Sequence, residues 1–462
     1  MVLFSGCKTH DNHIETKTVI PSYYSTNSTK ISAARANADS QQLIGQTKLD
    51  LAMLIDIACE NNPSVKRAWH AARAERARAK KANSAFYPTI VLSGMLQRTE
   101  ANTPIQAQHT VQKSVLNSIS PGVEMHYSLF KFGGTVLSAD AARYALYAAN
   151  YQFDRALQTV VHEVESAYFR LSSAEQTVIA KRNNLEDSKG TYEAAFTRHQ
   201  SGLTNIQEYL QAKASKAQAE FELEQALANV ESARAALAQL LGVKVSNDIE
   251  IIHPMVQKNL QEVDRSIDDL MTEVVRTRPD VKAAYAQVVA KEKLTKSVKR
   301  NLLPEFVVGG SGARTKYQHF KGQHNSFNVF AGLQWEIFDG FRNFYDIIEA
   351  RENAKIARAE FEQRKLQAQS EVWTYYFSLK SAFKQLGAAR KYVASAEESF
   401  LSMVISYKNG LCKFTDLLSA QSCLANAREQ LISSENNLLM AVSNLAYSTG
   451  GIVGSDLMNK QK

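Results

Sequence analysis

Apolar and polar residues alternate along four short segments of the chain. In the segment 118–129 the odd-numbered positions, from Ile119 to Leu129, are apolar and the even-numbered ones are small or polar. The same alternation runs through 90–97, 307–313 and 327–337, although glycines dilute it in the second of these. Period-two alternation is typical of a β-strand with one apolar face. The pattern therefore predicts two β-hairpins, one in each half of the chain.

Strand length indicates where these hairpins lie. About twelve residues at roughly 3.3 Å each, tilted by about 40°, span on the order of 30 Å, which matches the hydrocarbon core of a membrane. Aromatic residues stand near the strand ends, as in the interfacial girdles of membrane barrels: Phe86, Tyr87, Tyr127, Phe130, Tyr317, Trp335 and Phe338. We therefore expect the strands to be transmembrane.

The strand count has a consequence for assembly. Four strands are too few to close a barrel, because even the smallest filled barrel needs about eight. An open sheet edge in lipid leaves backbone groups without hydrogen bonds, which costs several kcal/mol for each group. If the strands cross a membrane, several copies of the chain must share one barrel.

Helical periodicity occupies most of the remaining sequence. Apolar residues recur at spacings of three and four from Leu51 onward, which predicts a helix over 50–84 and its counterpart over 266–299. Pro63 and Pro279 predict a break or kink in the first third of each helix, because proline cannot donate the backbone hydrogen bond of a helix interior.

The longest predicted helix covers 135–198 and measures roughly 96 Å at 1.5 Å per residue. A turn at Gly202 and a second helix over 205–241 follow it, and Gly410 marks the matching turn in the second half. Glycine favours the positive φ found just past a helix end. The helices over 205–241 and 50–84 together have about the length of the long helix. We therefore expect each half to set one long helix beside two short ones in a tall antiparallel tube.

The two halves are copies of one unit. Asn62-Pro63 returns as Arg278-Pro279, and the run 164–171 returns as 372–379 at a spacing about eight residues shorter. A repeat of this length indicates a duplicated supersecondary unit. Because loops tolerate changes of length, we expect the missing residues to come from the hairpin loop, which lies between Arg98 and Leu116 in the first copy.

Composition narrows the class of protein. The chain has 462 residues and a formal charge of +8, and its basic block, 73–81, lies inside a predicted helix among alanines. We interpret this block as a solvated helix face, because the aromatic or motif context of a nucleic-acid site is missing. The run 309–312 matches neither a phosphate loop nor a nucleophile elbow. Neither an enzyme nor a bound metal or cofactor is therefore predicted.

The beginning of the chain indicates a lipid anchor. Leu3-Phe4-Ser5-Gly6-Cys7 resembles the lipobox of bacterial lipoproteins, whose cysteine becomes acylated. An ordinary cysteine in a polar tail is the alternative, because the basic and hydrophobic regions of a signal peptide are missing or truncated.

These patterns divide the chain into five parts. We expect a leader, two repeats, a linker that wraps the tube as a belt, and a C-terminal tail; in order, they cover 1–48, 49–242, 243–265, 266–451 and 452–462.

With this layout the chain resembles the TolC-like outer membrane factors of Gram-negative bacteria, the outer membrane efflux protein family. The resemblance extends from Leu49 to Gly451. It rests on the duplicated proline-broken helix, on the sheet-to-helix motifs 129–134 and 337–342, and on the tip pattern 407–421. Each motif alone is a weak signal, but their order, present twice, is highly specific.

The resemblance implies a mainly α fold with a small transmembrane β portion. Three chains would form a twelve-stranded β-barrel and a periplasmic α-helical tube. It implies no catalytic site, but an outer membrane channel that is the exit duct of a tripartite efflux system for drugs or other small molecules. The implied partners are two further copies, a periplasmic adaptor protein, an inner-membrane transporter and outer membrane lipid, with no nucleic acid. Type I protein secretion is the alternative function. A soluble coiled-coil scaffold is a remoter one, because it leaves the alternating strands unexplained.

The family's helical-turn tips form the inner aperture and meet the adaptor. Carried over to this chain, the tip positions are His199, Gly202, Leu203, Tyr407, Gly410 and Leu411. An acid follows each glycine closely, Glu208 in the first tip and Asp416 in the second. If both acids face the lumen, a trimer gathers carboxylates in one constriction, and such rings favour cations. A solvated helix-face acid is the alternative, and it has more weight for Glu208 than for Asp416.

Overall fold

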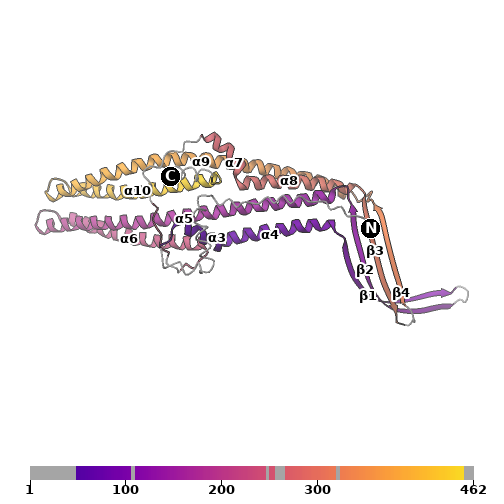
Figure 1. The fold of residues 1–462 in the computed structure, drawn as a ribbon. Helices are drawn as coiled ribbons and strands as arrows, with labels where there is room; N and C mark the ends of the chain where they lie inside the picture. The colour runs from indigo at the N-terminus through magenta and orange to yellow at the C-terminus, as the bar shows by residue number, and fades with distance from the viewer. Residues whose placement is uncertain (1–47, 106–109, 246–248, 255–265, 319–322, 452–462) are drawn as a thin grey trace. The chain divides into compact units, whose positions relative to one another are not determined.

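The structure is a computed structural model that describes residues 48–105, 110–245, 249–254, 266–318 and 323–451. The predicted leader with Cys7, the C-terminal tail and most of the linker lie outside the described residues. The helices and strands, drawn in Figure 1, are α3 (Leu51–Asn61), α4 (Pro63–Asn83), η1 (Ser84–Phe86), β1 (Thr89–Ile105), β2 (Thr110–Phe130), α5 (Gly134–Gln200), α6 (Ile206–Leu241), α7 (Ile267–Thr277), α8 (Pro279–Lys299), η2 (Arg300–Leu302), β3 (Glu305–Tyr317), β4 (Gln323–Gln334), α9 (Arg342–Lys408) and α10 (Phe414–Ser448).

The element order confirms the duplicated, mainly α fold. Each repeat has a broken helix, a hairpin, a long helix and a shorter helix, and the long helices α5 and α9 have 67 residues each. The chain divides into two compact units: the first comprises 1–70, 150–282 and 364–462, and the second comprises 71–149 and 283–363. No helix among the described residues is long and apolar enough to cross a membrane.

The predicted breaks at the prolines are confirmed in both repeats. The residues before them, Asn62 and Arg278, have ψ of 125° and separate α3 from α4 and α7 from α8. Proline disfavours the α region for the preceding residue, which explains the extended geometry. The Asn62 side-chain amide donates to the carbonyl oxygen of Leu240 over 2.7 Å, so the end of α6 meets the break. Arg278 makes the equivalent contact with the carbonyl of Ser448 at the end of α10, over 3.3 Å.

Close backbone packing requires a glycine at the end of α6. Gly242 has a φ of +69°, and a Cβ there would lie 2.8 Å from the carbonyl oxygen of Asn61. A larger residue would push α6 away from α3. This supports the expectation that the two short helices of a repeat are stacked end to end beside the long one.

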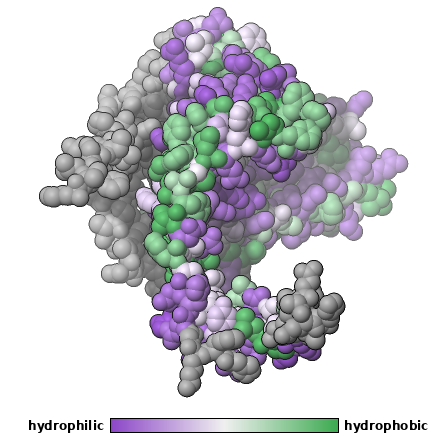
Figure 2. All heavy atoms as spheres, turned by 90° about the vertical axis from the view of Figure 1, so that its right-hand side faces the viewer, coloured by the Kyte–Doolittle hydropathy of each residue, from purple (hydrophilic) through white to green (hydrophobic). Residues whose placement is uncertain are grey.

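The four strands form one antiparallel sheet in the second unit, in the order β1-β2-β3-β4. Apolar side chains on its outer strands are strongly exposed: Ile90 is 68 %, Leu96 81 % and Phe327 84 % accessible. Figure 2 shows hydrophobic residues gathered in patches on the face that it presents, with polar residues beside them. A sheet that leaves large apolar side chains uncovered has its apolar face available to lipid or to another chain.

The first hairpin shows that the prediction of a longer loop between Arg98 and Leu116 was wrong. β1 and β2 stay paired from Thr89↔His126 as far as Ile105↔Thr110, whereas the pairing of β3 with β4 ends at Lys316↔Gln323. The extra residues of the first copy therefore lengthen a two-stranded ribbon instead of a loop. Adding residues to both strands keeps the ladder of backbone hydrogen bonds intact, which a sequence spacing does not show. β4 also ends at Gln334, earlier than the alternation to 337 predicts.

Two hydrophobic clusters hold the first unit together. One joins α3, α5, α6 and the bridge between Leu49 and Ile251. The other lies near the ends of the helical hairpins and includes Phe400, Tyr407 and Phe414. The second cluster surrounds the residues that the sequence marks as functional.

Candidate functional site

The first helical turn joins α5 to α6. The backbone N–H groups of Gly202 and Leu203 donate to the carbonyls of His199 and Arg198 over 3.0 and 2.9 Å, and Gly202 has a φ of +69°. Asn205 caps α6, since its side chain accepts a hydrogen bond from the N–H of Gln207. The positive φ explains why glycine is found at this position.

The second turn, from α9 to α10, repeats this backbone. The N–H groups of Gly410 and Leu411 donate to the carbonyls of Tyr407 and Ser406 over 3.0 and 2.8 Å, and Gly410 has a φ of +78°. The carboxylate of Asp416 accepts from the N–H of Lys413 over 3.4 Å, which satisfies a free donor at the start of α10. We call these two turns, over 198–209 and 406–417, the first tip and the second tip.

The second tip is packed around Tyr407. Its side chain is 2 % exposed, and its ring lies 5.5 Å from that of Phe414, which is equally buried. The matching residue of the first tip, His199, is half-buried and stacks on Tyr209 with 5.8 Å between ring centroids. The second tip thus has an aromatic core, whereas the aromatic residues of the first tip lie at its surface.

A hydrogen bond joins the two tips. The Tyr407 hydroxyl donates to Oε2 of Glu208 over 2.9 Å. Burial raises the pKa of Tyr407, and the bond to the Glu208 carboxylate raises it further, so the hydroxyl keeps its proton at physiological pH. The structure therefore brings together two predicted site residues, and the Glu208 side chain reaches the second tip of its own chain.

Arg198 is a residue of this site that the sequence did not single out. Its Nη1 donates to the Tyr407 carbonyl over 3.0 Å, and its guanidinium carbon lies 5.0 Å from the Tyr407 ring centroid. Nε of Arg198 is buried without a hydrogen-bond partner among the described residues. The only sequence signal is a basic side chain in the last turn of α5, a common position for one because of the helix dipole.

The remaining predicted residues lie at the surface of the tips. Leu203 and Leu411 are 67 % and 79 % exposed, and Asp416 of the second tip is also exposed. Cys412 lies inward, with Sγ 3.7 Å from the Met403 carbonyl oxygen; burial and the nearby Asp416 carboxylate raise the pKa of its thiol. Exposed leucines on a turn can contact a partner protein, and a raised pKa disfavours the reactive thiolate form of Cys412.

Polar contacts connect the repeats above the tips, along α5 and α10. Gln421 accepts from Thr191 and donates to Ser188, and Arg428 pairs with Asp187 over 2.7 Å. Further along the same helices, Lys181 of α5 pairs with Glu429 of α10, and Ser443 donates to Glu165. Lys181 also pairs with Glu222 of α6, so the polar contacts extend into the first helical hairpin.

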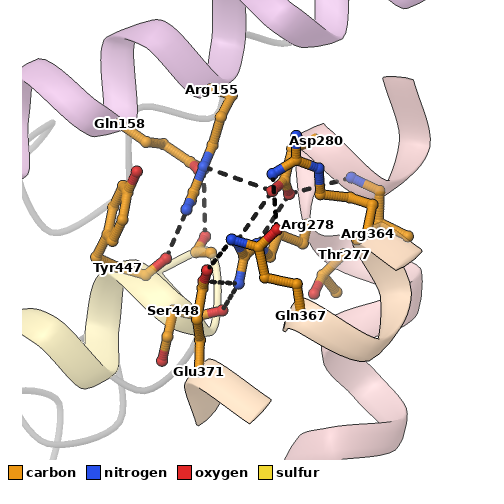
Figure 3. A network of polar contacts seen from close by, with 12 residues as sticks. Arg155, Gln158, Thr277, Arg278, Asp280, Arg364, Gln367, Glu371, Tyr447 and Ser448 are labelled. Carbon is orange, nitrogen blue, oxygen red and sulfur yellow. Dashed lines mark hydrogen bonds and ion pairs between the residues drawn. The ribbon is translucent and has the colours of Figure 1, made fainter. Parts of the chain in front are cut away.

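Farther along the first unit, at the end of α10, charged residues form a compact network (Figure 3). Arg278 is 1 % exposed; it holds both oxygens of Asp280, over 2.8 and 2.9 Å, and it pairs with Glu371 over 2.6 Å. The guanidinium of Arg155 lies 3.7 Å from the ring centroid of Tyr447. Each buried charge has a partner, as burial requires. The arrangement connects the break between α7 and α8 with α9 and the end of α10.

The described residues contain no group of three His, Cys, Asp or Glu side chains arranged for a metal ion. The tips therefore offer hydrogen bonds, exposed apolar side chains and carboxylates. Such features can hold a passage closed, select ions and contact a protein.

Comparisons with known proteins match this geometry. The family model described as outer membrane efflux protein matches residues 54–243 and 270–451. The chain is 25 % identical over 413 residues to protein CyaE of Bordetella pertussis, covering 87 % of this chain and 85 % of that one. It is 23 % identical to the outer membrane efflux protein BepC of Brucella suis, covering 87 % and 85 %. The crystal structure of the CmeC outer membrane channel of Campylobacter jejuni superposes with a TM-score of 0.79 at 18 % identity, covering 87 % of this chain and 85 % of that one.

Proposed function

This chain belongs to the outer membrane efflux protein family, and we propose that three copies of it form the exit duct of a tripartite efflux system. The protein is an outer membrane channel whose helical part stands in the periplasm. A periplasmic adaptor and an inner-membrane transporter would complete the system.

The sheet is the observation that supports three-chain assembly most directly. Four strands with exposed apolar side chains and two free edges, β1 and β4, cannot form a closed surface in lipid alone. If β4 of one copy pairs with β1 of the next, three copies supply twelve strands and remove every edge.

The mass of the particle extracted from isolated outer membranes in mild detergent tests this assembly. We expect a particle of three chains, found in the outer membrane fraction alone. A monomer in the soluble fraction would contradict the shared barrel and favour the coiled-coil scaffold.

Small molecules are the cargo that we propose, with type I protein secretion as the second candidate. The two tips of a chain are joined by a hydrogen bond between side chains, and a small solute needs only a narrow opening. Deletion of the chain should therefore raise drug accumulation in cells. Loss of a secreted protein with unchanged drug accumulation would favour the second candidate.

At the tips we propose two separate roles. The exposed Leu203 and Leu411, with the turn glycines beside them, would contact the adaptor. The bond from Tyr407 to Glu208, supported by Arg198, would hold the two hairpins of a chain together and keep the aperture closed. Asp416 would contribute one carboxylate per chain to the constriction.

Acylation of Cys7 is a further proposal, which rests on the lipobox alone. Metabolic labelling with a palmitate analogue tests it. The wild type should incorporate the label, whereas a Cys7→Ser variant that labels equally well would contradict the anchor.

A further inference from the structure

The connections between helices and strands in the second unit carry basic side chains at one level. Register places these connections together, because Thr89 pairs with His126, Phe130 with Phe306, and Glu305 with Gln334. The segments before β1, after β2 and before β3, which include the last turns of α4 and α8, carry six cations, which we call the junction cations: Lys80, Lys81, Lys131, Lys296, Lys299 and Arg300.

The junction cations are accessible. Lys131 is half-exposed and the other five are exposed. The fourth connection differs, since Arg342 pairs there with Glu336 over 3.2 Å and lies 3.9 Å from Asp339. Among the described residues, ion pairs are found for Arg342 but for none of the six junction cations. Their charge is therefore left for an external partner.

Helix stability explains only some of these cations. Lys80, Lys81, Lys296 and Lys299 lie in the last turns of α4 and α8, where a positive charge favours the helix dipole. Lys131 lies just before the first turn of α5, where the dipole disfavours a cation. A role that all six junction cations share must therefore involve a partner other than the helix dipoles.

The neighbouring aromatic residues show what surrounds this level. Phe132 has a φ of +46° and Phe341 a φ of +67°, although both are non-glycine residues and are 41 % and 62 % exposed. Such backbone costs roughly 1–2 kcal/mol per residue. Each ring packs on one neighbouring ring, Phe132 on Phe130 and Phe341 on Phe338, with 5.0 and 5.5 Å between centroids, yet it remains partly exposed. Exposed aromatic rings are favoured at the boundary between lipid and water. If the sheet spans the outer membrane, as proposed above, the junction cations stand at the headgroup level of the leaflet that faces the periplasm.

We propose that the junction cations bind the anionic headgroups of phospholipids in the periplasmic leaflet of the outer membrane. The proposal rests on the function proposed above, because it requires the sheet to span that membrane. Lysine and arginine near an anionic surface attract phosphate groups, and salt weakens this attraction within a Debye length of about 8 Å at physiological ionic strength.

Trp335 provides a reporter at the site. It follows β4, is 56 % exposed, and its Nε1 donates to the carbonyl of Leu302, two residues after Arg300 in the chain. Lipids with brominated acyl chains quench tryptophan on contact. The purified protein is reconstituted in turn with brominated phosphatidylglycerol and brominated phosphatidylcholine, and the ratio of the two binding constants is measured.

The wild type should prefer phosphatidylglycerol by at least about fivefold, the effect expected of one cation near a charged surface. The variant Lys80→Gln/Lys81→Gln/Lys131→Gln should lose most of this preference, and high salt should remove it from the wild type. The matched control Lys213→Gln/Lys384→Gln/Lys391→Gln loses the same charge from exposed positions on α6 and α9 and should keep the preference.

Two results would overturn the proposal in different ways. Equal quenching by both lipids in the wild type, or equal loss in the variant and its control, would show that the junction cations select no headgroup while the membrane placement stands. Quenching by neither lipid would overturn the membrane placement itself.

Discussion

His199 of the first tip and Tyr407 of the second tip occupy the same position before their glycines. His199 is half-buried and lies against Tyr209, whereas Tyr407 is only 2 % exposed. Ile206 and Phe414 also correspond, and they are 54 % and 2 % exposed. One backbone turn therefore supports two different surroundings. The second tip is a buried core that receives Arg198 and Glu208 from the first, so the two repeats share the backbone of the turn and differ in the side chains that link the tips.

The largest expected effect comes from breaking this link. Tyr407→Phe keeps the aromatic core but removes the hydroxyl that bonds Glu208. A hydrogen bond to a charged group is worth about 1.5–3 kcal/mol, which corresponds to a population shift of roughly ten- to a hundredfold in each chain. We expect cells with this variant to admit a large hydrophilic antibiotic that the wild type excludes. His199→Phe, which keeps the stack on Tyr209, is the matched change in the first tip and should leave entry unchanged.

A pH titration tests whether the tips behave separately from the rest of the first unit. Burial and the neighbouring Arg155 lower the pKa of His162 from 6.5 to about 4. The unfolded chain therefore binds a proton that the folded one does not, so stability falls as pH drops from about 6.5 to about 4, by at most about 3 kcal/mol. Thermal unfolding from pH 7 to 4.5 measures this. His162→Gln should flatten the dependence without opening the aperture; an unchanged slope would contradict the assignment.

Arg198 should have a smaller effect than Tyr407, because it contacts the Tyr407 carbonyl and ring without reaching Glu208. Arg198→Met should weaken closure by about 1–2 kcal/mol per chain. Lys408→Met removes an exposed charge from the end of α9 and is the control. Antibiotic entry that rises equally in both variants would indicate a general charge effect.

Because the two turns share one backbone conformation, we expect the same substitution in each turn to have the same effect on stability. Gly202→Ala and Gly410→Ala each place a side chain at a positive φ and should lower the free energy of unfolding by about 1–2 kcal/mol. Gly387→Ala is the control, since this helical glycine in α9 has open space around it and should stabilise by about 0.5–1 kcal/mol. Unequal losses at the two turns would mean that the tips differ in backbone as well as in side chains.

Asp416→Ala should change stability least, by about 0.5–1 kcal/mol through the lost cap at the start of α10. If its carboxylate lines the constriction, cation preference in single-channel recordings should fall as well. Unchanged conductance and selectivity would leave Asp416 with the capping role only.

Local patterns predicted the elements of this fold closely. Proline directly after the extended residues 62 and 278, and glycine at 202 and 410, act within a few positions of the chain, so spacing alone located the helix ends. The extent of the first ribbon was not predictable in this way. It depends on which strands continue to pair beyond Arg98, and alternation weakens there although the ladder continues.

The site was predictable as a set of positions but not as a set of contacts. Motif order identified both turns and both acids, whereas the bond from Tyr407 to Glu208 joins residues from different repeats. Arg198 escaped notice because a basic residue near a helix end has an ordinary explanation. Arg278 likewise replaces Asn62 of the first repeat, and only the structure shows that both cover the end of a neighbouring helix.

The single-channel conductance of reconstituted trimers tests the central claim most directly, with the wild type, Tyr407→Phe, Glu208→Gln and the double variant compared in one bilayer system. We predict low conductance for the wild type, a similar rise in each single variant, and no further rise in the double variant, because both changes remove one bond. Equal conductance in all four, or additive rises, would contradict the claim that this bond closes the duct.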